Sequence, residues 1–376
     1  MYVNRAIEPC VTQDLRRKMV FIGGPRQAGK TCMAKYLLNK QQPNGKDRYL
    51  NWDALADREK IMKETFPTGS GLLILDEVHK YANWRHTVKG LYDKRRDELD
   101  ILVTGSARLD YYRRGGDSLQ GRYFFYHLFP FTLSELPHAG ATTLQDLMHY
   151  SGFPEPFLLA SERETRRWSR EYRFRCVRED LRDLERVHEI DKIERMMLRL
   201  PELVGSPLSI NALREDLQVA HRSVSRWLVM LENLFVLFRV YPFGAATIRA
   251  VKKEAKHYHL DWTQVQDEGK RFENLVAVHL LKWCYFMADT QGHDMELRYF
   301  RDIDGREVDF VLLKGGVPIH FIECKKSGKT INRALRYLKK KFPEVASTQI
   351  SLENTADLTS KDGIRSCAAH MFLRDY

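Results

Sequence analysis

Residues 18–31 read KMVFIGGPRQAGKT, and this stretch indicates how the first part of the chain folds. The apolar run MVFI is typical of a buried strand, and positions 24–31 fit the pattern G-x-x-x-x-G-K-[ST]. A glycine-rich turn between a strand and a helix directs backbone amides and the helix N-terminus towards phosphate groups. The pattern therefore predicts an ATP site in which Lys30 contacts the β- and γ-phosphates and Thr31 binds Mg²⁺. The residues expected to surround the phosphates are Gly24, Pro25, Arg26, Gln27, Ala28, Gly29, Lys30 and Thr31.

The second half of such a site is predicted from LLILDE at positions 72–77, an apolar strand that ends in two acids. Asp76 suits the Mg²⁺ shell, and Glu77 suits activation of the attacking water. A third apolar run, ILVTGS, ends in Thr104 and Ser106, where a polar side chain can sense the γ-phosphate. A purely structural role for Thr104 at the end of its strand is an equal alternative.

Short apolar runs alternate with helical patterns over the first 155 residues. This alternation predicts an α/β fold with a parallel sheet and helices on both faces, of the AAA+-like P-loop type. The stretch YSGFPEPF at 150–157 contains one glycine and two prolines and marks a domain boundary. The expected strands are 18–24, 47–52, 71–77 and 100–106.

Three further segments follow this ATPase domain, which we place at 1–155. Residues 156–200 predict a helical linker or lid, in which a near balance of arginines and acids favours a solvated, salt-bridged face over a DNA-binding stripe. Residues 201–262 predict two helices and a strand pair and resemble a winged helix-turn-helix. In that module the 222–226 segment would face a DNA groove through Arg222, Ser223 and Arg226, and the alternative is a module that only packs domains together.

The last segment, 263–376, contains the hairpin VDFVLLKGGVPIHFIECKKS at 308–327. Asp309 and Glu323 stand where core residues are expected, and Lys325 lies on the same strand face as Glu323. A buried carboxylate is costly unless it is paired or binds a metal. Two converging carboxylates favour Mg²⁺, or Mn²⁺, and a neighbouring lysine can help to activate a water. The turn length decides whether Asp309 lies opposite Glu323 or opposite Ile322, and the sequence leaves both open.

Two features extend this candidate nuclease site. Glu273, on the helix that precedes the hairpin, can complete the metal ligands. The segment 325–341 contains eight basic residues and no acid, which suits a phosphodiester substrate. The E-x-K pattern also occurs at Glu254/Lys256 and at Glu268/Lys270, but only Glu323/Lys325 ends an apolar strand. The alternative is a satisfied ion cluster in a catalytically silent domain.

Composition narrows the class of partner. The formal net charge of +11 favours a polyanionic partner, with DNA first, and a hydrophobic fraction of 43% is ample for packed cores. The six cysteines form no C-x-x-C pair, which favours a reducing cytoplasm over a disulfide framework or a zinc site. Neither a signal peptide nor a membrane span is expected.

Several of these stretches carry a resemblance to a known family. GPRQAGKT, LLILDEVHKYANW, ILVTGSARLDYYRRGGDSLQGRYFFYHLFPFTLSEL and GFPEPF are similar to a widespread family of bacterial and archaeal AAA+/STAND-type ATPases. The resemblance implies an arginine finger or sensor at Arg122, with Arg108 as the second candidate, and it implies a possible homo-oligomer. The same family carries a C-terminal nuclease-like domain. Glu273, Asp309 and Glu323-x-Lys325 resemble the PD-(D/E)xK core of Holliday-junction resolvases and RecB-like nucleases, although Val308 stands where the motif has proline.

These observations together predict an ATP-hydrolysing DNA-processing protein. An AAA+-like motor or switch would act on a metal-dependent C-terminal nuclease, with Glu273, Asp309, Glu323 and Lys325 as its catalytic residues. The alternative is a nucleotide-dependent switch or scaffold, or a STAND-like signalling or defence ATPase, whose C-terminal domain binds DNA or protein without cutting.

Overall fold

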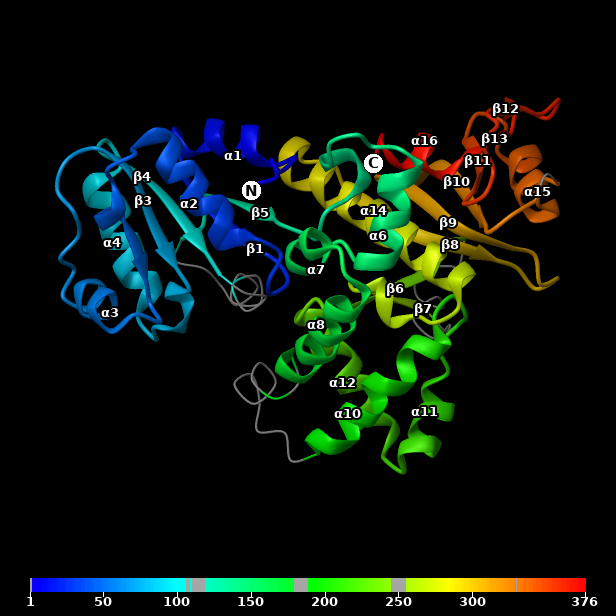
Figure 1. Cartoon of the computed structure of the whole chain (residues 1–376), viewed down its shortest axis with the longest axis horizontal. Coiled ribbons are helices and arrows are strands. Elements are labelled where there is room, and N and C mark those ends of the chain that lie inside the picture. Colours follow the sequence, from blue (N-terminus) through cyan, green and yellow to red (C-terminus); the bar gives the residue numbers. More distant parts are fainter. Residues whose placement is uncertain are drawn as a thin grey trace. The chain divides into compact units, whose positions relative to one another are not determined.

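The structure is a computed structural model, and it divides the chain into two compact units (Figure 1). The first unit comprises Met1–Pro130 with Asp289–Gln291, and the second comprises Phe131–Ala288 with Gly292–Tyr376. The described residues are 2–105, 109, 119–176, 178, 189–244, 255–328 and 330–376.

The first unit is built on a five-stranded, fully parallel sheet in the order β2-β3-β4-β1-β5. The predicted parallel α/β sheet is therefore confirmed, with each expected strand within two residues of its observed bounds. The fifth strand, β5, was not predicted. The strands are β1 (Met19–Gly23), β2 (Tyr49–Asn51), β3 (Gly71–Asp76), β4 (Leu99–Thr104) and β5 (Tyr123–His127).

Helices cover both faces of this sheet. On one face, Ile61 of α3 and Val88 of α4 share a buried core with Phe21, Leu73 and Val103. The strand residues between these point to the other face, where α1 and α2 contact β1, β3 and β4. The helices are α1 (Glu8–Leu15), α2 (Lys30–Gln41), α3 (Leu55–Met62) and α4 (Trp84–Arg95), with 3-10 turns η1 (Lys46–Arg48) and η2 (Val78–Lys80).

The second unit begins with helices. On α8, Arg166 pairs with Glu162 and Arg175 pairs with Glu171, as expected for a salt-bridged, solvated face. A boundary was predicted near residue 155, but α6 and α7 already belong to this unit. The elements are η3 (Leu133–Glu135), α6 (Ala141–Tyr150), α7 (Pro154–Leu159), α8 (Glu162–Arg175), α10 (Ile190–Arg199), η5 (Leu200–Leu203), α11 (Ile210–Leu217) and α12 (His221–Asn233).

An eight-stranded mixed sheet forms the rest of this unit, in the order β12-β13-β11-β10-β9-β8-β6-β7. The strand pair expected inside the winged-helix-like module is β6 and β7, and β6 also pairs with β8. These two strands therefore extend the C-terminal sheet, and β7 is buried along its whole length. The strands are β6 (Leu237–Pro242), β7 (Lys256–His259), β8 (Met295–Arg301), β9 (Glu307–Lys314), β10 (Val317–Lys325), β11 (Ala346–Ser351), β12 (Leu358–Thr359) and β13 (Arg365–Ala368).

Three helices and one turn accompany this sheet. The apolar side of α15, which includes Leu335 and Leu338, packs on Val311 of β9 and Phe321 of β10. The basic side chains of α15 lie on its other side. None of the described helices is long and apolar enough to cross a membrane. The elements are η6 (Trp262–Gln264), α14 (Glu268–Gln291), α15 (Arg333–Lys341) and α16 (Ala369–Leu373).

Candidate nucleotide site and carboxylate cluster

Two glycines shape the loop between β1 and α2. Gly24 has φ 134°, and a Cβ there would lie 2.4 Å from the carbonyl oxygen of Leu128, so no larger residue fits. Gly29 has φ 98° and is the N-cap of α2. The loop thus ends at the N-terminus of α2. Because Gly24 and Gly29 have no side chains, the backbone is accessible at these two positions, which suits phosphate binding.

Lys30 is the first residue of α2, and its ammonium folds back over the loop. Its Nζ donates to the carbonyl oxygens of Gly24, at 3.0 Å, and Pro25, at 2.6 Å. Only 8% of Lys30 is exposed. The ammonium therefore already lies inside the loop, where the β- and γ-phosphates of a nucleotide would provide stronger acceptors than the two carbonyls.

The Asp76 carboxylate, at the end of β3, accepts three hydrogen bonds from hydroxyl groups. Thr31 Oγ1 donates to it at 2.9 Å, Thr104 Oγ1 at 2.5 Å and Tyr49 OH at 2.7 Å. The expected meeting of Thr31, Asp76 and Thr104 is therefore observed. The contact of Tyr49 with Asp76 was missed, although the segment DRYLNW contains β2, which pairs with β3. Burial, and then the Asp76 carboxylate, raise the pKa of Tyr49, so its hydroxyl stays a donor.

Glu77 adopts a left-handed backbone with φ 56°, and its amide donates to the carbonyl oxygen of Thr104 at 2.9 Å. Its carboxylate lies 3.6 Å from both His79 Nε2 and Lys80 Nζ. Burial raises the pKa of Glu77, and Lys80 and Lys30 oppose that rise. A left-handed conformation at a non-glycine residue is strained, and such strain is concentrated at functional sites.

The remaining loop residues contribute backbone groups. Gln27 has φ 60°. The Ala28 carbonyl accepts a 2.8 Å hydrogen bond from Arg5, a buried arginine that was not predicted. Arg26 is half-buried beside them. Arg5 belongs to none of the motifs in the sequence and donates to a backbone carbonyl, so no motif signals this contact.

Arg122 lies away from this loop. It directly precedes β5 and forms a paired contact with Asp93 of α4, at 2.8 and 3.2 Å. β1 and β5 are parallel and pair Met19 with Tyr123. Arg122 therefore lies at the N-terminal end of these strands, whereas Gly24 follows the C-terminal end of β1. A sensor role within its own chain is therefore not supported, and a finger role across subunits stays a prediction. Ser106 and Arg108 lie outside the described residues.

The loop and its neighbours fit a magnesium nucleotide. The glycine backbone leaves room for phosphates, Lys30 supplies a cation, and the Thr31 hydroxyl touches the Asp76 carboxylate. These are the donors and acceptors that hold a phosphate and its Mg²⁺ at a helix N-terminus. The site can therefore bind a nucleoside triphosphate.

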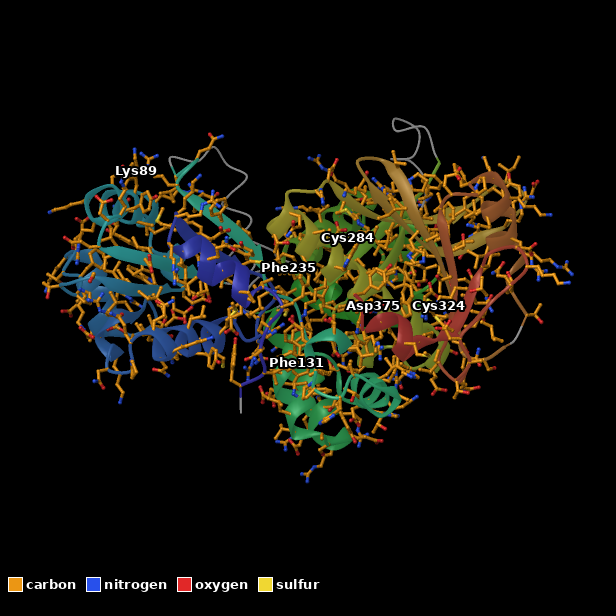
Figure 2. All side chains as sticks on the ribbon, turned by 90° about the horizontal axis from the view of Figure 1, so that it is seen from above. Lys89, Phe131, Phe235, Cys284, Cys324 and Asp375 are labelled. Atoms are coloured by element: carbon orange, nitrogen blue, oxygen red, sulfur yellow. The ribbon has the colours of Figure 1, made fainter. Side chains whose placement is uncertain are left out.

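A second cluster lies at the β9–β10 hairpin, near Cys324, which is labelled in Figure 2 and which stands between Glu323 and Lys325 in the sequence. The turn has two residues, since Val317 pairs with Lys314, but a bulge between Pro318 and His320 shifts the register. Beyond the bulge Phe310 pairs with Ile322, so Asp309 falls opposite Glu323. The Cys324 amide donates to Asp309 Oδ2 at 2.9 Å.

Glu323 is 3% exposed and is held on one oxygen only. Its Oε1 accepts from Lys325 Nζ at 2.5 Å and from the side-chain amide of Asn332, the N-cap of α15. Its Oε2 is buried and has no hydrogen-bond partner among the described residues. The predicted placement of Glu323 and Lys325 on one strand face is therefore observed, and their ion pair corresponds to the alternative of an ion cluster, while Asn332 was missed.

A buried lysine joins the other carboxylates. Lys256 of β7 is 1% exposed, and its Nζ lies 3.2 Å from Glu273, 2.7 Å from Glu307 and 3.5 Å from Asp309. Tyr258 OH also donates to Glu273, at 2.6 Å. Lys256 and Glu307 were missed, because the E-x-K pattern that contains Lys256 does not end an apolar strand. The sequence carries no signal for Lys256, because KHYH is a polar run and its burial is seen only in the structure.

Burial and crowding of like charges change the acidities in this cluster. Burial, and then the charge of Asp309, raise the pKa of Glu273 to about 7 and that of Glu323 to about 7. Burial alone would lower the pKa of Lys256, but the carboxylates of Glu273, Asp309 and Glu307 outweigh burial and raise it. Lys256 is therefore a permanent cation at physiological pH.

The cluster does not fit a divalent metal as it stands. Across the ranges that the structure describes, no three His, Cys, Asp or Glu side chains are arranged to hold a metal ion. The ion was expected between Asp309 and Glu323 with Glu273 completing its ligands, but the Lys256 ammonium lies against two of these three acids, Glu273 and Asp309. The metal role predicted for Asp309 and Glu323 is therefore not supported by this geometry.

We expect Glu323→Gln to change how stability depends on pH. With a pKa of about 7 in the folded state and about 4.3 when unfolded, the Glu323 carboxyl adds stability below about pH 4.3, and this stability is lost as the pH rises through 7. Relative to Glu323→Gln, the wild type should gain about 1 kcal/mol in unfolding free energy between pH 8 and pH 6, measured by urea unfolding.

The comparison with a variant is needed because buried histidines oppose this effect. Their lowered pKa values cost stability as the pH falls, and they act equally in both proteins. Glu353→Gln, at an exposed acid of the same unit, should show no pH-dependent difference from wild type. Equal slopes for wild type and Glu323→Gln would contradict a raised Glu323 pKa. The opposing residues are His257, His259, His279 and His320.

Basic side chains are exposed on α15 and α12. On α15, Arg333, Lys340 and Lys341 are exposed, while Arg336 pairs with Asp362 at 3.3 Å. Lys339 instead donates to backbone carbonyls. The two helices of the winged-helix-like module, α11 and α12, lie where they were predicted. Arg222 and Arg226 are exposed on α12, Ser223 is half-buried, and Lys329 lies outside the described residues.

The sheet, the loop and the Thr31–Asp76 contact define a P-loop ATPase domain. Comparison with known families agrees, because residues 16–137 match the family described as AAA domain. The N-terminal part of the chain is therefore an AAA+-like ATPase domain. Residues 141–263 and 268–369 match two families described as domains of unknown function, DUF8612 and DUF4143.

Similar proteins occur in bacteria and archaea. An uncharacterized protein of Mycobacterium tuberculosis, Rv2008c, is 24% identical over 332 residues, which cover 85% of this chain and 73% of that protein. An uncharacterized protein of Haemophilus influenzae is 21% identical over 374 residues, which cover 89% of this chain and 90% of that protein. An uncharacterized protein of Methanocaldococcus jannaschii, MJ1637, is 22% identical over a match that covers 90% of this chain and 82% of that protein.

Solved structures give a weaker likeness. The Aeropyrum pernix ORC1 protein in complex with DNA has a TM-score of 0.34 and 13% identity, and 74% of this chain and 93% of that chain are covered. The Thermotoga maritima RuvB Holliday junction branch migration motor has a TM-score of 0.33 and 16% identity, and the match covers 63% of this chain and 90% of that chain. Likenesses of this strength are too weak to define the fold or the function of this chain.

Proposed function

We propose that this protein is an ATP-hydrolysing switch that binds DNA through its C-terminal domain and does not cut it. The observation that carries the ATP half is the contact of the Thr31 hydroxyl with the Asp76 carboxylate beside the Lys30 ammonium. Lys30 would hold the β- and γ-phosphates, and Thr31 and Asp76 would hold Mg²⁺. A Mg²⁺ ion held there would supply positive charge against the negative charge that develops on the transferred phosphoryl group.

Water activation is assigned to Glu77. Its carboxylate follows Asp76 directly, its backbone is tied to β4 through Thr104, and Lys80 lies beside it. At neutral pH a carboxylate can accept a proton from a water that is also polarised by the γ-phosphate. Tyr49 and Thr104 hold the Asp76 carboxylate from the neighbouring strands.

The DNA half rests on the exposed side of α15. This helix contains no acid, and its exposed Arg333, Lys340 and Lys341 add to a chain with a net charge of +11. Lysine and arginine side chains on one exposed face bind phosphates without sequence preference. Arg222 and Arg226, exposed on α12, form a second basic region of the same unit.

Neutralising α15 should weaken DNA binding. The combined change Arg333→Ala, Lys340→Ala and Lys341→Ala is expected to lower affinity and to make the slope of log K against log salt less negative by about 0.9 for each phosphate that is no longer neutralised. Fluorescence anisotropy at several salt concentrations measures both quantities. The matched control removes three arginines from α8, with Arg163→Ala, Arg166→Ala and Arg170→Ala, and should leave the slope unchanged. Equal effects of both triple variants would indicate non-specific charge attraction instead.

The competing function is the metal-dependent nuclease predicted from the PD-(D/E)xK-like residues. Glu323 Oε2, which has no hydrogen-bond partner in the described part of the chain, lies beside Asp309 and favours it, whereas the Lys256 ammonium opposes it. Supercoiled, linear, single-stranded and branched DNA would be incubated with Mg²⁺ or Mn²⁺, with and without ATP. We expect binding and ATP turnover without cleavage. Cleavage by wild type that Asp309→Ala abolishes would overturn the switch in favour of the nuclease.

A further inference from the structure

The carboxylate cluster of the second unit has an internal cation. Lys256 Nζ is within 3.5 Å of three acids that come from two elements: Glu273 of α14, and Glu307 and Asp309 of β9. Each contact is within ion-pair distance, and the side chain that makes them is 1% exposed. A lysine buried this deeply is stable only when carboxylates replace the water around its ammonium.

The surroundings hold this arrangement in place. Tyr258, two residues along β7, donates to the same Glu273 oxygen at 2.6 Å. On the other side, a Cβ at Gly205 would lie 3.0 Å from Glu273 Oε2, so backbone closes that side of the carboxylate. Arg301 lies 3.6 Å from Glu307 and supplies a further positive charge. The Glu273 carboxylate is therefore held towards Lys256.

We propose that Lys256 is a built-in counter-ion that takes the place of a divalent cation in this cluster and closes the site to metals. An ammonium and a divalent cation between the same carboxylates would repel each other at a few ångströms, so the two cannot bind together. Removal of the ammonium would leave the carboxylates of Glu273, Glu307 and Asp309 without their cation, and they would have to move together before their oxygens could act as ligands of Mg²⁺ or Mn²⁺. One side chain thus separates an ion-paired scaffold from a cation site.

The test uses the full-length, nucleotide-free chain and Mn²⁺ as the probe, with free Mn²⁺ counted by electron paramagnetic resonance. Wild type and Asp309→Asn should bind the same number of ions, because ions held elsewhere are common to both. Lys256→Gln should bind one more ion than wild type, and the double variant Lys256→Gln/Asp309→Asn should lose it. The same extra ion should raise the melting temperature of Lys256→Gln and leave that of wild type unchanged.

Two outcomes would overturn the proposal. One is a Mn²⁺ ion on wild type that Asp309→Asn removes, and this comparison needs no change at Lys256. The other is a folded Lys256→Gln that gains no ion. If Lys256→Gln does not fold without metal, circular dichroism in Mn²⁺ replaces the count, and recovery of folding that Asp309→Asn abolishes is the expected result. The test involves neither ATP nor DNA, so its failure is distinct from failure of the proposed function.

Discussion

Lys30→Ala should abolish ATP turnover while the fold is retained. The ammonium of Lys30 lies inside the P-loop, bonded to the carbonyls of Gly24 and Pro25, and no other lysine among the described residues occupies that position. Loss of a cation that stabilises charge on a transferring phosphoryl group costs about 100-fold or more in rate. Phosphate release at saturating ATP measures the effect, and circular dichroism checks the fold.

Two variants show whether the loss is specific. Lys40→Ala removes a lysine from the last turn of the same helix, where its side chain is mostly exposed near Glu8, and should leave turnover unchanged. Glu77→Gln should keep nucleotide affinity and lose turnover, because an amide cannot accept the proton of the attacking water. Turnover that survives Lys30→Ala would place ATP hydrolysis elsewhere or attribute it to a contaminant.

Lys256→Ala should destabilise the second unit by about 3–5 kcal/mol, since it leaves buried carboxylates without their counter-ion. Glu273, Glu307 and Asp309 all lose the same partner at once. Urea unfolding followed by tryptophan fluorescence measures this decrease in stability.

Arg301→Ala is the matched control for this prediction. Arg301 also pairs with Glu307, at 3.6 Å, but its side chain is 48% exposed, so its removal should cost less than about 1 kcal/mol. Asp309→Asn introduced together with Lys256→Ala should recover part of the lost stability, because one uncompensated charge disappears. A cost for Lys256→Ala no larger than that for Arg301→Ala would mean that the cluster is hydrated and weak.

The parallel sheet of the first unit could be predicted because β1, β3 and β4 each contain a continuous apolar run next to a recognisable turn or acid. β5 escaped prediction because its polar and aromatic residues, YFFYH, do not form such a run. The C-terminal sheet was harder for another reason. β6 and β7 form a hairpin that is local in sequence, but β6 also pairs with β8, which lies beyond a 24-residue helix.

The nucleotide site was largely predictable, since its residues lie in short contiguous motifs. Tyr49 and Arg5 were not, because each acts through a contact made only after folding. The carboxylate cluster was half predictable. Asp309, Glu323 and Lys325 follow from strand periodicity, whereas Lys256 enters from a strand more than fifty residues earlier and is recognisable only by its burial.

The bulge in β10 has a consequence for how this hairpin tolerates changes in length. With the two-residue turn alone, Asp309 would lie opposite Ile322, and the single extra residue between Pro318 and His320 moves it opposite Glu323. Deleting that one extra residue would leave a regular two-residue hairpin in which His320 still follows Pro318 opposite Leu312, and Asp309 would stay opposite Glu323. This segment of β10 can therefore lose one residue without separating the two acids, whereas a one-residue deletion from β9 between Asp309 and the turn would place Asp309 opposite Ile322.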